Sequence, residues 1–171
     1  MRIGLTYDLA ADWAAEGLDA EQLAEFDAEI TVDAHGNAMA DGGICATLRD
    51  LGRFGLLFGG TVRRSSRWSV VPVSWIEDTI GGAPDGPEAF VAGEGVRFPP
   101  GAHYRNCWWV AEPAVPFFYA AGINGQHVFV DRRKQVVIAK LSTWPSALHP
   151  VSQVTLDAAK AIAAALPSTA R

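Results

Sequence analysis

Short apolar stretches in the second half of the chain constrain the fold more than any other feature. They cover Asn106–Val110, Val115–Ala121, Gln126–Val130 and Gln135–Leu141. The last two flank Asp131-Arg132-Arg133-Lys134, a polar connection whose length is typical of an antiparallel hairpin. The sequence therefore predicts a succession of antiparallel strands in this half.

Helical signals lie on both sides of these strands. Thr47 and Asp50 resemble a capping box, so we expect a helix that starts at Thr47 and stops at Gly59-Gly60. A second helix is expected after Pro72, whose fixed φ suits a first helical position. Its predicted buried face consists of Trp75, Ile76 and Ile80.

The end of the chain predicts a third helix, from about Val151 to Leu166. Its predicted buried stripe consists of Val151, Val154, Ala158, Ile162 and Leu166. Glu29–Ala34 alternates like a half-buried strand, and Gly81–Pro100 is rich in Gly and Pro and predicts a long loop. This order of elements indicates an α+β fold.

Composition excludes some classes of partner. The 171 residues carry a net charge of −5, which gives no reason to expect nucleic acid or a membrane surface. Arg63, Arg64 and Arg67, and the turn Arg132–Lys134, are interpreted as solvated loops. No apolar run is long enough to span a bilayer, and no leader is evident. We therefore expect a cytoplasmic protein.

The two cysteines, Cys45 and Cys107, are far apart in sequence and lack metal-type spacing. Two buried free thiols in a reducing compartment are the favoured interpretation, and a disulfide is the alternative. His35, His103, His127 and His149 show no helical pairing, so we expect no metal and no cofactor. Each histidine is interpreted as a turn or surface residue.

Nucleophilic motifs are absent from the sequence. It contains neither G-x-S-x-G nor S-x-x-K, and none of Lys134, Lys140 and Lys160 follows a serine by three residues. Tyr104-Arg105-Asn106 fits the short pattern Y-x-N, but we interpret it as the start of a buried strand. We therefore predict no catalytic residue in this chain.

Two other segments are candidates for a binding site. Trp108 and Trp109 should point to opposite sides of a strand, and the ring that faces the long loop lines either a pocket or the core. Gly122 and Gly125, within Ala121–Gln126, allow close approach by a ligand or by another backbone segment. Backbone N–H groups there could receive a developing oxyanion, although a plain turn would have the same sequence.

Three segments together resemble one family. Gly42–Leu51 and the following Arg53-Phe54-Gly55 are similar to the G-G-x-x-x-T-x-R-D-L-A-R-x-G signature of β-lactamase-related serine hydrolases. Gly122–Gln126 and Lys140–Pro145 are similar to G-I-H-G-Q and K-L-S-S-W-P of the 6-aminohexanoate-dimer hydrolase-like subgroup. Asp27–Asp33, just before the signature, is also similar to that subgroup.

This resemblance divides the chain into three parts. It covers residues 26–166, which it identifies as the C-terminal half of a serine β-lactamase-like domain. Residues 1–25 match the family poorly, and 167–171 form a tail. The fold that the resemblance implies is the C-terminal portion of a β-lactamase/transpeptidase-like fold, an antiparallel sheet with flanking helices.

The family's S-x-x-K and Y-x-N motifs act through an acyl-enzyme on esters or amides. Both precede the matched region, so the resemblance places them before Met1 and implies that this chain alone is inactive. It makes Asn124, Gly125 and Gln126 the substrate-binding residues, with the Gln126 backbone N–H as an oxyanion donor. The subgroup usually has His where this chain has Asn124, and Asn does not titrate near neutrality.

Three functional readings follow. The chain is one part of a hydrolase for a small amide or ester substrate, a non-catalytic binding or complementing module, or a remnant of a truncated gene. An incomplete domain would expose a sheet edge and an apolar helix face. We therefore expect self-association or a complementing chain as partner.

Overall fold

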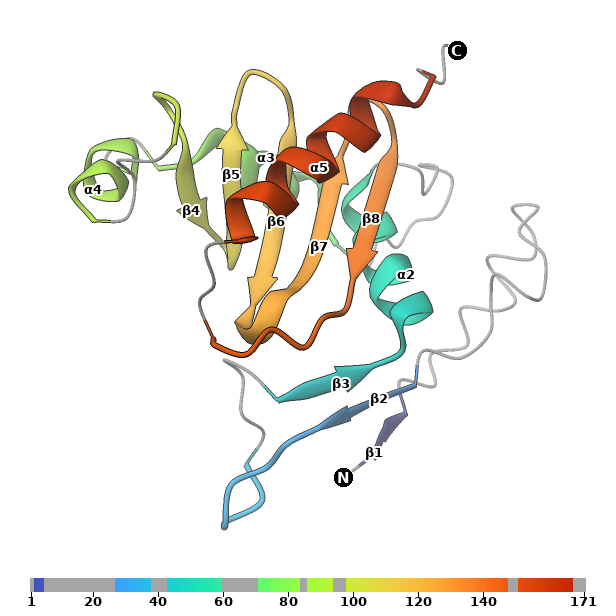
Figure 1. The fold of residues 1–171 in the computed structure, drawn as a ribbon. Coiled ribbons are helices and arrows are strands. Elements are labelled where there is room, and N and C mark those ends of the chain that lie inside the picture. Colours follow the sequence, from blue (N-terminus) through green and yellow to red (C-terminus); the bar gives the residue numbers. More distant parts are fainter. Residues whose placement is uncertain are drawn as a thin grey trace.

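In the computed structural model, the described residues are 2–4, 27–37, 43–59, 71–83, 86–93, 98–147 and 151–167. Within these ranges the centre is a sheet in which five consecutive antiparallel strands lie in chain order (Figure 1). The strands are β4 (His103–Arg105), β5 (Trp108–Glu112), β6 (Phe117–Gly122), β7 (Gln126–Asp131) and β8 (Val136–Lys140). The predicted antiparallel strands and the β7–β8 hairpin are confirmed.

The β4–β5 connection corrects one prediction. Asn106 and Cys107 form a two-residue turn with φ of 52° and 66°, the left-handed geometry that matches the twist of a tight hairpin. Tyr104 is half exposed, on the edge strand β4. Tyr104-Arg105-Asn106 is thus an edge strand entering a turn, and its interpretation as the start of a buried strand was wrong.

Helices cover both faces of the sheet (Figure 1). Helices α2 (Leu48–Gly59) and α3 (Val73–Gly81) cover one face, and α5 (Val151–Ala165) crosses the other. The α2 side holds a buried cluster of Phe58, Ile76, Trp108, Val110, Phe118, Val128 and Val130. The α5 side holds a second cluster of Ala111, Phe117, Tyr119, Phe129, Leu156, Ala159 and Ala163.

The start of α2 is capped as its sequence predicts. The Thr47 Oγ1 accepts a hydrogen bond from the Asp50 backbone N–H at 3.1 Å and donates one to the Asp50 carboxylate at 2.6 Å. Asp50 is buried and also pairs with Arg53 at 3.0 Å. The T-x-R-D part of the signature therefore fixes the helix start.

Gly55 lets α2 lie close to the sheet. A Cβ built on Gly55 would lie 2.5 Å from Val137 Cγ1 and 3.0 Å from Val128 Cγ1, closer than carbon atoms normally approach. The glycine of Arg53-Phe54-Gly55 is thus required by the contact of α2 with β7 and β8.

Helix α5 presents the opposite face from the one predicted. Its buried residues are Leu156, Ala159 and Ala163, whereas Val154 and Ile162 are 63% and 51% exposed. The stripe of Val151, Val154, Ala158, Ile162 and Leu166, here called the α5 outer stripe, faces away from the sheet. The physical reason is the small size of the alanine side chains, which lets the helix axis lie close to the aromatic residues on this face of the sheet.

Further predictions about burial were wrong for Trp75 and for two histidines. Ile76 is buried in α3 and Ile80 half-buried, but Trp75 is half exposed. His103 is buried with its ring nitrogens 3.0 Å from the carbonyls of Gly101 and Thr79, and His127 is buried as well. Hydrogen bonds to backbone carbonyls allow both rings to be buried, which helical spacing could not reveal.

Other predictions need smaller corrections. Cys45 and Cys107 are free, as favoured, but both are exposed. The predicted loop Gly81–Pro100 contains a helix, α4 (Gly86–Ala92), whose Pro87 stands at a position compatible with a first helical turn.

A second, smaller sheet lies below the five-stranded one (Figure 1). Its strands are β1 (Arg2–Gly4), β2 (Asp27–Ile30) and β3 (Ile44–Ala46), all antiparallel. The strand predicted at Glu29–Ala34 begins earlier and ends at Ile30, and the Asp33 carboxylate accepts hydrogen bonds from His35 and Asn37 in the following turn. Among the described residues, none of the helices is long and apolar enough to cross a bilayer.

Candidate functional site

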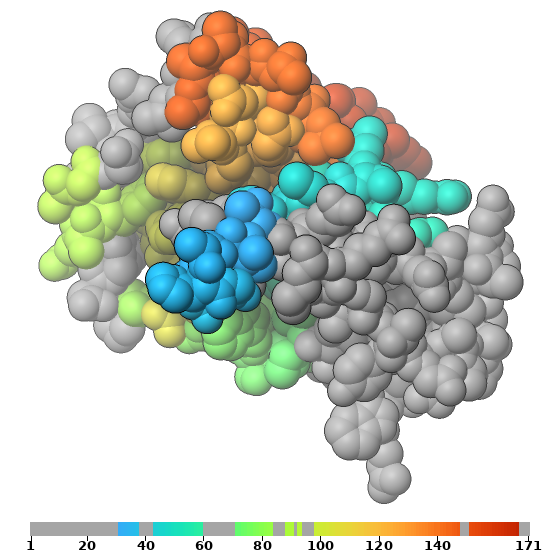
Figure 2. All heavy atoms as spheres, turned by 90° about the horizontal axis from the view of Figure 1, so that it is seen from below, coloured from blue at the N-terminus to red at the C-terminus, as the bar shows by residue number. Residues whose placement is uncertain are grey.

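The candidate site is the tight turn between β6 and β7. Ile123–Gly125 form a tight turn and not a regular helix, because Asn124 has φ 58° and Gly125 has φ 87°. Asn and Gly are the residues that adopt this left-handed geometry most readily. The turn lies at the end of the sheet that faces the reader in Figure 2, where its surface adjoins that of residues 141–147.

Hydrogen bonds join this turn to the segment 141–147. The Asn124 backbone N–H donates to the Ala147 carbonyl at 3.2 Å, and the Trp144 N–H donates to the Asn124 carbonyl at 3.1 Å. The Asn124 side-chain amide donates to the Trp144 carbonyl at 2.8 Å. The turn and the segment therefore form one rigid unit, although some twenty residues separate them in sequence.

Gln126 completes this unit. Its amide nitrogen donates to the Ser142 carbonyl at 2.5 Å, and its amide oxygen accepts from the Ser142 N–H at 3.0 Å. The two bonds mimic a rung of backbone pairing and hold Ser142 beside the first residue of β7. Gly122–Gln126 and Lys140–Pro145, which carry part of the family resemblance, are thus in direct contact.

The Gly125 carbonyl oxygen accepts hydrogen bonds from two side chains. Lys140 Nζ donates to it at 3.1 Å, and His127 Nδ1 lies 3.0 Å away. Because a carbonyl oxygen only accepts, this contact assigns a proton to Nδ1 of His127. The Lys140 ammonium also lies 4.6 Å from the centre of the Trp144 ring, in cation–π geometry.

The pKa of the buried His127 imidazole lies below its ordinary value of 6.5. Burial lowers the pKa of its imidazole, the hydrogen bond with Gly125 raises it, and the nearby Lys140 cation lowers it further. The net direction is downward. The Gly125 carbonyl requires a proton on Nδ1 of His127, which the neutral Nδ1–H tautomer supplies.

The side chains of Asn124 and Gln126 serve internal contacts in this structure. The expected oxyanion donor is the Gln126 backbone N–H rather than its side chain, and that assignment stays a prediction. Ile123, which sequence reasoning did not select, is 68% exposed at the tip of the turn. Its position after a glycine at a strand end is the only sequence signal that could have indicated this.

An apolar hollow of about 330 Å³ lies beside β4 and β5. Trp109, Tyr104 and Phe90 contribute rings to it, together with Ala89 and Gly93 at the end of α4. As predicted, Trp108 and Trp109 point to opposite faces, with Trp108 in the α2-side core. Trp109, whose ring faces the predicted loop region, therefore both packs against the core and lines the hollow.

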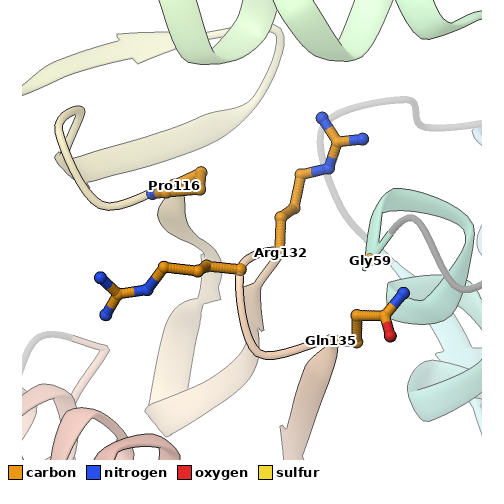
Figure 3. Close-up of a pocket in the computed structure, with 5 residues that line it drawn as sticks. Gly59, Pro116, Arg132 and Gln135 are labelled. Atoms are coloured by element: carbon orange, nitrogen blue, oxygen red, sulfur yellow. The ribbon is translucent and has the colours of Figure 1, made fainter. Parts of the chain in front are cut away.

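A second hollow, of about 440 Å³, lies at the other end of β7 (Figure 3). Gly59, Pro116, Arg132, Arg133 and Gln135 surround it. Arg133 is exposed and Arg132 half-buried, while Lys134 donates to the Ala164 and Leu166 carbonyls at the end of α5. Within the described ranges, no three His, Cys, Asp or Glu side chains are grouped as metal ligands would be.

Similarity to known proteins indicates the family to which the chain belongs. No family profile matches the chain. Over 136 residues, or 78% of its length, the chain is 38% identical to the 6-aminohexanoate-dimer hydrolase of Paenarthrobacter ureafaciens. The chain belongs to the 6-aminohexanoate-dimer hydrolase family. It spans 32% of the length of that relative, which fits a C-terminal part of such a hydrolase.

A solved structure supports the fold of this 6-aminohexanoate-dimer hydrolase family member. A Bacillus anthracis protein carrying the same name matches 80% of the chain with a TM-score of 0.63 at 23% identity. The chain covers 33% of that structure. The fold class is therefore α+β, the C-terminal portion of the 6-aminohexanoate-dimer hydrolase fold.

Proposed function

We propose that this chain is the C-terminal part of a serine hydrolase that cleaves a small amide or ester substrate through an acyl-enzyme. The observation that carries the proposal is the contact between the turn Gly122–Gln126 and the segment 141–147. Two family-like segments that are separate in sequence build one rigid end of the sheet. A rigid backbone is what a preorganised oxyanion donor needs.

In this proposal the Gln126 N–H donates to the substrate carbonyl oxygen as negative charge develops on it. Asn124 and Gly125 shape the turn that aims this N–H. The serine and lysine of S-x-x-K and the tyrosine of Y-x-N come from a complementing N-terminal part. The chain alone therefore forms no acyl-enzyme, because an oxyanion donor without a nucleophile gives at most a small residual rate.

The apolar hollow at Trp109 suits the hydrocarbon part of such a substrate. Its walls are Trp109, Tyr104 and Phe90, and aromatic rings bury alkyl chains without requiring hydrogen bonds. It opens beside α4. The region Gly81–Pro100, together with the N-terminal part, would select the acyl group.

The α5 outer stripe and the edge of β8 suit the complementing part. Val154 and Ile162 are more than half exposed, and in the described part of the chain β8 pairs with β7 alone. Burial of one such aliphatic side chain contributes about 1.5–3 kcal/mol. This surface would bind either an N-terminal part or a second copy of the chain.

The free thiols Cys45 and Cys107 fit a reducing, cytoplasmic location.

The test combines this chain with the N-terminal part of the Paenarthrobacter ureafaciens relative, expressed as a separate polypeptide. Labelling by a fluorophosphonate and turnover of an activated ester are measured for each part and for the mixture. We expect both signals only in the mixture. Labelling of this chain alone at a serine, with steady turnover, would overturn the proposal.

A pair of variants at one position then tests the Gln126 N–H. Gln126→Pro removes the N–H, whereas Gln126→Ala removes only the side chain and is the matched control. Loss of one oxyanion donor lowers kcat by about 10²–10³-fold. The ratio of kcat between the two variants should reach that range, and equal kcat values would exclude Gln126 as the donor.

The alternative is a non-catalytic complementing or binding module, which the α5 outer stripe favours. It predicts that the mixture forms a stable complex without labelling or turnover. Sedimentation of the mixture distinguishes this outcome from simple failure to associate.

A further inference from the structure

We propose that the hollow between the end of α2 and the β7–β8 loop binds a small molecule through its carboxylate or phosphate group. The hollow has a volume of about 440 Å³, which is within the range of small-ligand sites. Arg132 and Arg133 are among the residues that surround it (Figure 3). Planar guanidinium groups bind carboxylates and phosphates through paired, charge-assisted hydrogen bonds. Such binding would occur whether or not the chain is part of a hydrolase.

Within the described ranges, no acidic side chain forms an ion pair with Arg132 or Arg133. The ion pairs found there join other residues. Lys134, the third cation of the loop, donates instead to the Ala164 and Leu166 carbonyls at the end of α5. The two guanidinium groups, one on a half-buried residue and one on an exposed residue, are therefore the positive charges that an anion in the hollow would meet.

The acidic residue of the loop, Asp131, lies on the other face of the sheet. Val130 packs in the α2-side cluster and Phe129 in the α5-side cluster, so the alternation of β7 places Asp131 on the α5 side. Its carboxylate accepts the Lys134 backbone N–H at 2.9 Å. The end of α2 at Gly59 contributes about half a negative charge from its last carbonyls. Two arginines exceed that charge, so the hollow is positive.

The backbone that carries the two arginines is held on both sides. The Arg132 N–H donates to the Pro116 carbonyl at 3.1 Å, which joins the loop to the connection between β5 and β6. The Lys134 side chain joins the loop to α5. Gln135 closes the loop with φ 56° and also lines the hollow. A ligand therefore has to order side chains but not the loop itself, which lowers the entropic cost of binding.

The hollow is separate from the candidate turn. Strand β7 begins at Gln126, next to that turn, and ends at Asp131, next to the hollow (Figure 1). A strand of 6 residues is about 20 Å long. A molecule in the hollow therefore does not compete directly with a substrate at the turn.

The test uses benzoate and phenyl phosphate as probes, with benzamide as the uncharged counterpart of benzoate, at constant low ionic strength. The amide resonances of the full 171-residue chain are followed by nuclear magnetic resonance during each titration. We expect saturable shifts at Gly59 and at residues 132–135 with the anions and none with benzamide. The ratio of the two affinities identifies the preferred anionic group. Equal shifts with benzamide, or shifts confined to other parts of the chain, would overturn the proposal.

Two variants then test the arginines directly. Arg132→Met and Arg133→Met each remove one guanidinium group and should weaken binding about tenfold, the effect of losing one hydrogen bond to a charged group. Arg49→Met is the matched control, because Arg49 is exposed in the first turn of α2, at the other end of the helix from Gly59. It removes the same charge and should leave the affinity unchanged.

The comparison with the control separates a site from a general response to net charge. An equal loss of affinity in Arg49→Met would overturn the proposal, as would unchanged affinity in both hollow variants. Arg133 is exposed, so Arg133→Met keeps the test valid if Arg132→Met alters the fold.

Discussion

The indole ring of Trp144 occupies the space that a side chain at position 125 would need. A Cβ on Gly125 would lie 2.5 Å from two atoms of the Trp144 ring. The turn residue and the ring that covers it therefore depend on each other. The sequence predicts that another group lies close to this glycine, and in the structure that group is the Trp144 side chain.

Gly125→Ala should destabilise the protein by about 2–4 kcal/mol, since it adds a steric clash to the cost of a left-handed alanine. Gly36→Ala is the matched control, because Gly36 has φ 85° but no atom within 4 Å of its Cβ position. The control should lose only about 1–2 kcal/mol. Urea denaturation gives both values, and equal losses would mean that Trp144 moves aside at no cost.

Gly55 and Gly52 offer a second matched pair, within α2. Gly55→Ala should cost about 1–3 kcal/mol because its methyl group would collide with Val137 and Val128. Gly52 has open space at its Cβ position, so Gly52→Ala should stabilise the helix by about 0.5–1 kcal/mol. Thermal denaturation should move the two melting temperatures in opposite directions, and a shared direction would contradict the packing described for α2.

The faces of α5 predict contrasting effects of substitution. Leu156→Ala, on the buried face, should destabilise by about 2–5 kcal/mol. Ile162→Ser, on the outer stripe, should change stability by less than about 0.5 kcal/mol. Sedimentation should show weaker self-association or weaker binding of the complementing part for Ile162→Ser. No change in either association would remove the outer stripe as a docking surface.

His127 predicts a pH dependence of stability. Its folded-state pKa lies below its ordinary value of 6.5, so the unfolded chain binds more protons as pH falls. The stabilisation is fully present above pH 6.5 and is lost as pH falls through the folded-state pKa. Denaturant midpoints between pH 7.5 and about 5 should decline in the wild type and decline less in His127→Gln.

The carboxylates with lowered pKa titrate in a separate range. Hydrogen bonds from Arg105 and Asn106 hold the pKa of Asp78 below its ordinary value of 3.8, and bonds from Asn37 and His35 do the same for Asp33. Their contribution is present above that value and is lost only at lower pH. An unchanged pH profile in His127→Gln above pH 5 would therefore contradict the assignment to His127.

Local patterns were sufficient for much of the fold. The cap at Thr47, the helix after Pro72 and the β7–β8 hairpin depend on neighbours in sequence, and the structure has each of them. The outer stripe of α5 was misassigned because the chain has two apolar faces there. Hydrophobic spacing alone does not determine whether the valine face or the alanine face of the helix packs against the sheet.

The site was only partly predictable for a similar reason. The glycines and the family-like segments indicated the turn, and periodicity placed it between two strands. The contacts of Gln126 with Ser142, and of Lys140 with Gly125, join residues some fifteen positions apart across a hairpin. They depend on strand register and on side-chain reach, which periodicity does not specify.

The contact between Lys134 and the end of α5 affects the local unfolding of both segments. Its ammonium binds the last carbonyls of α5, which has no basic residue of its own in the final turn. Fraying of the helix end therefore breaks the contacts that join it to the hairpin loop some thirty residues earlier. In hydrogen exchange, the amides of that loop and of the last turn of α5 should open together as one cooperative unit, and acetylation of Lys134 would separate them.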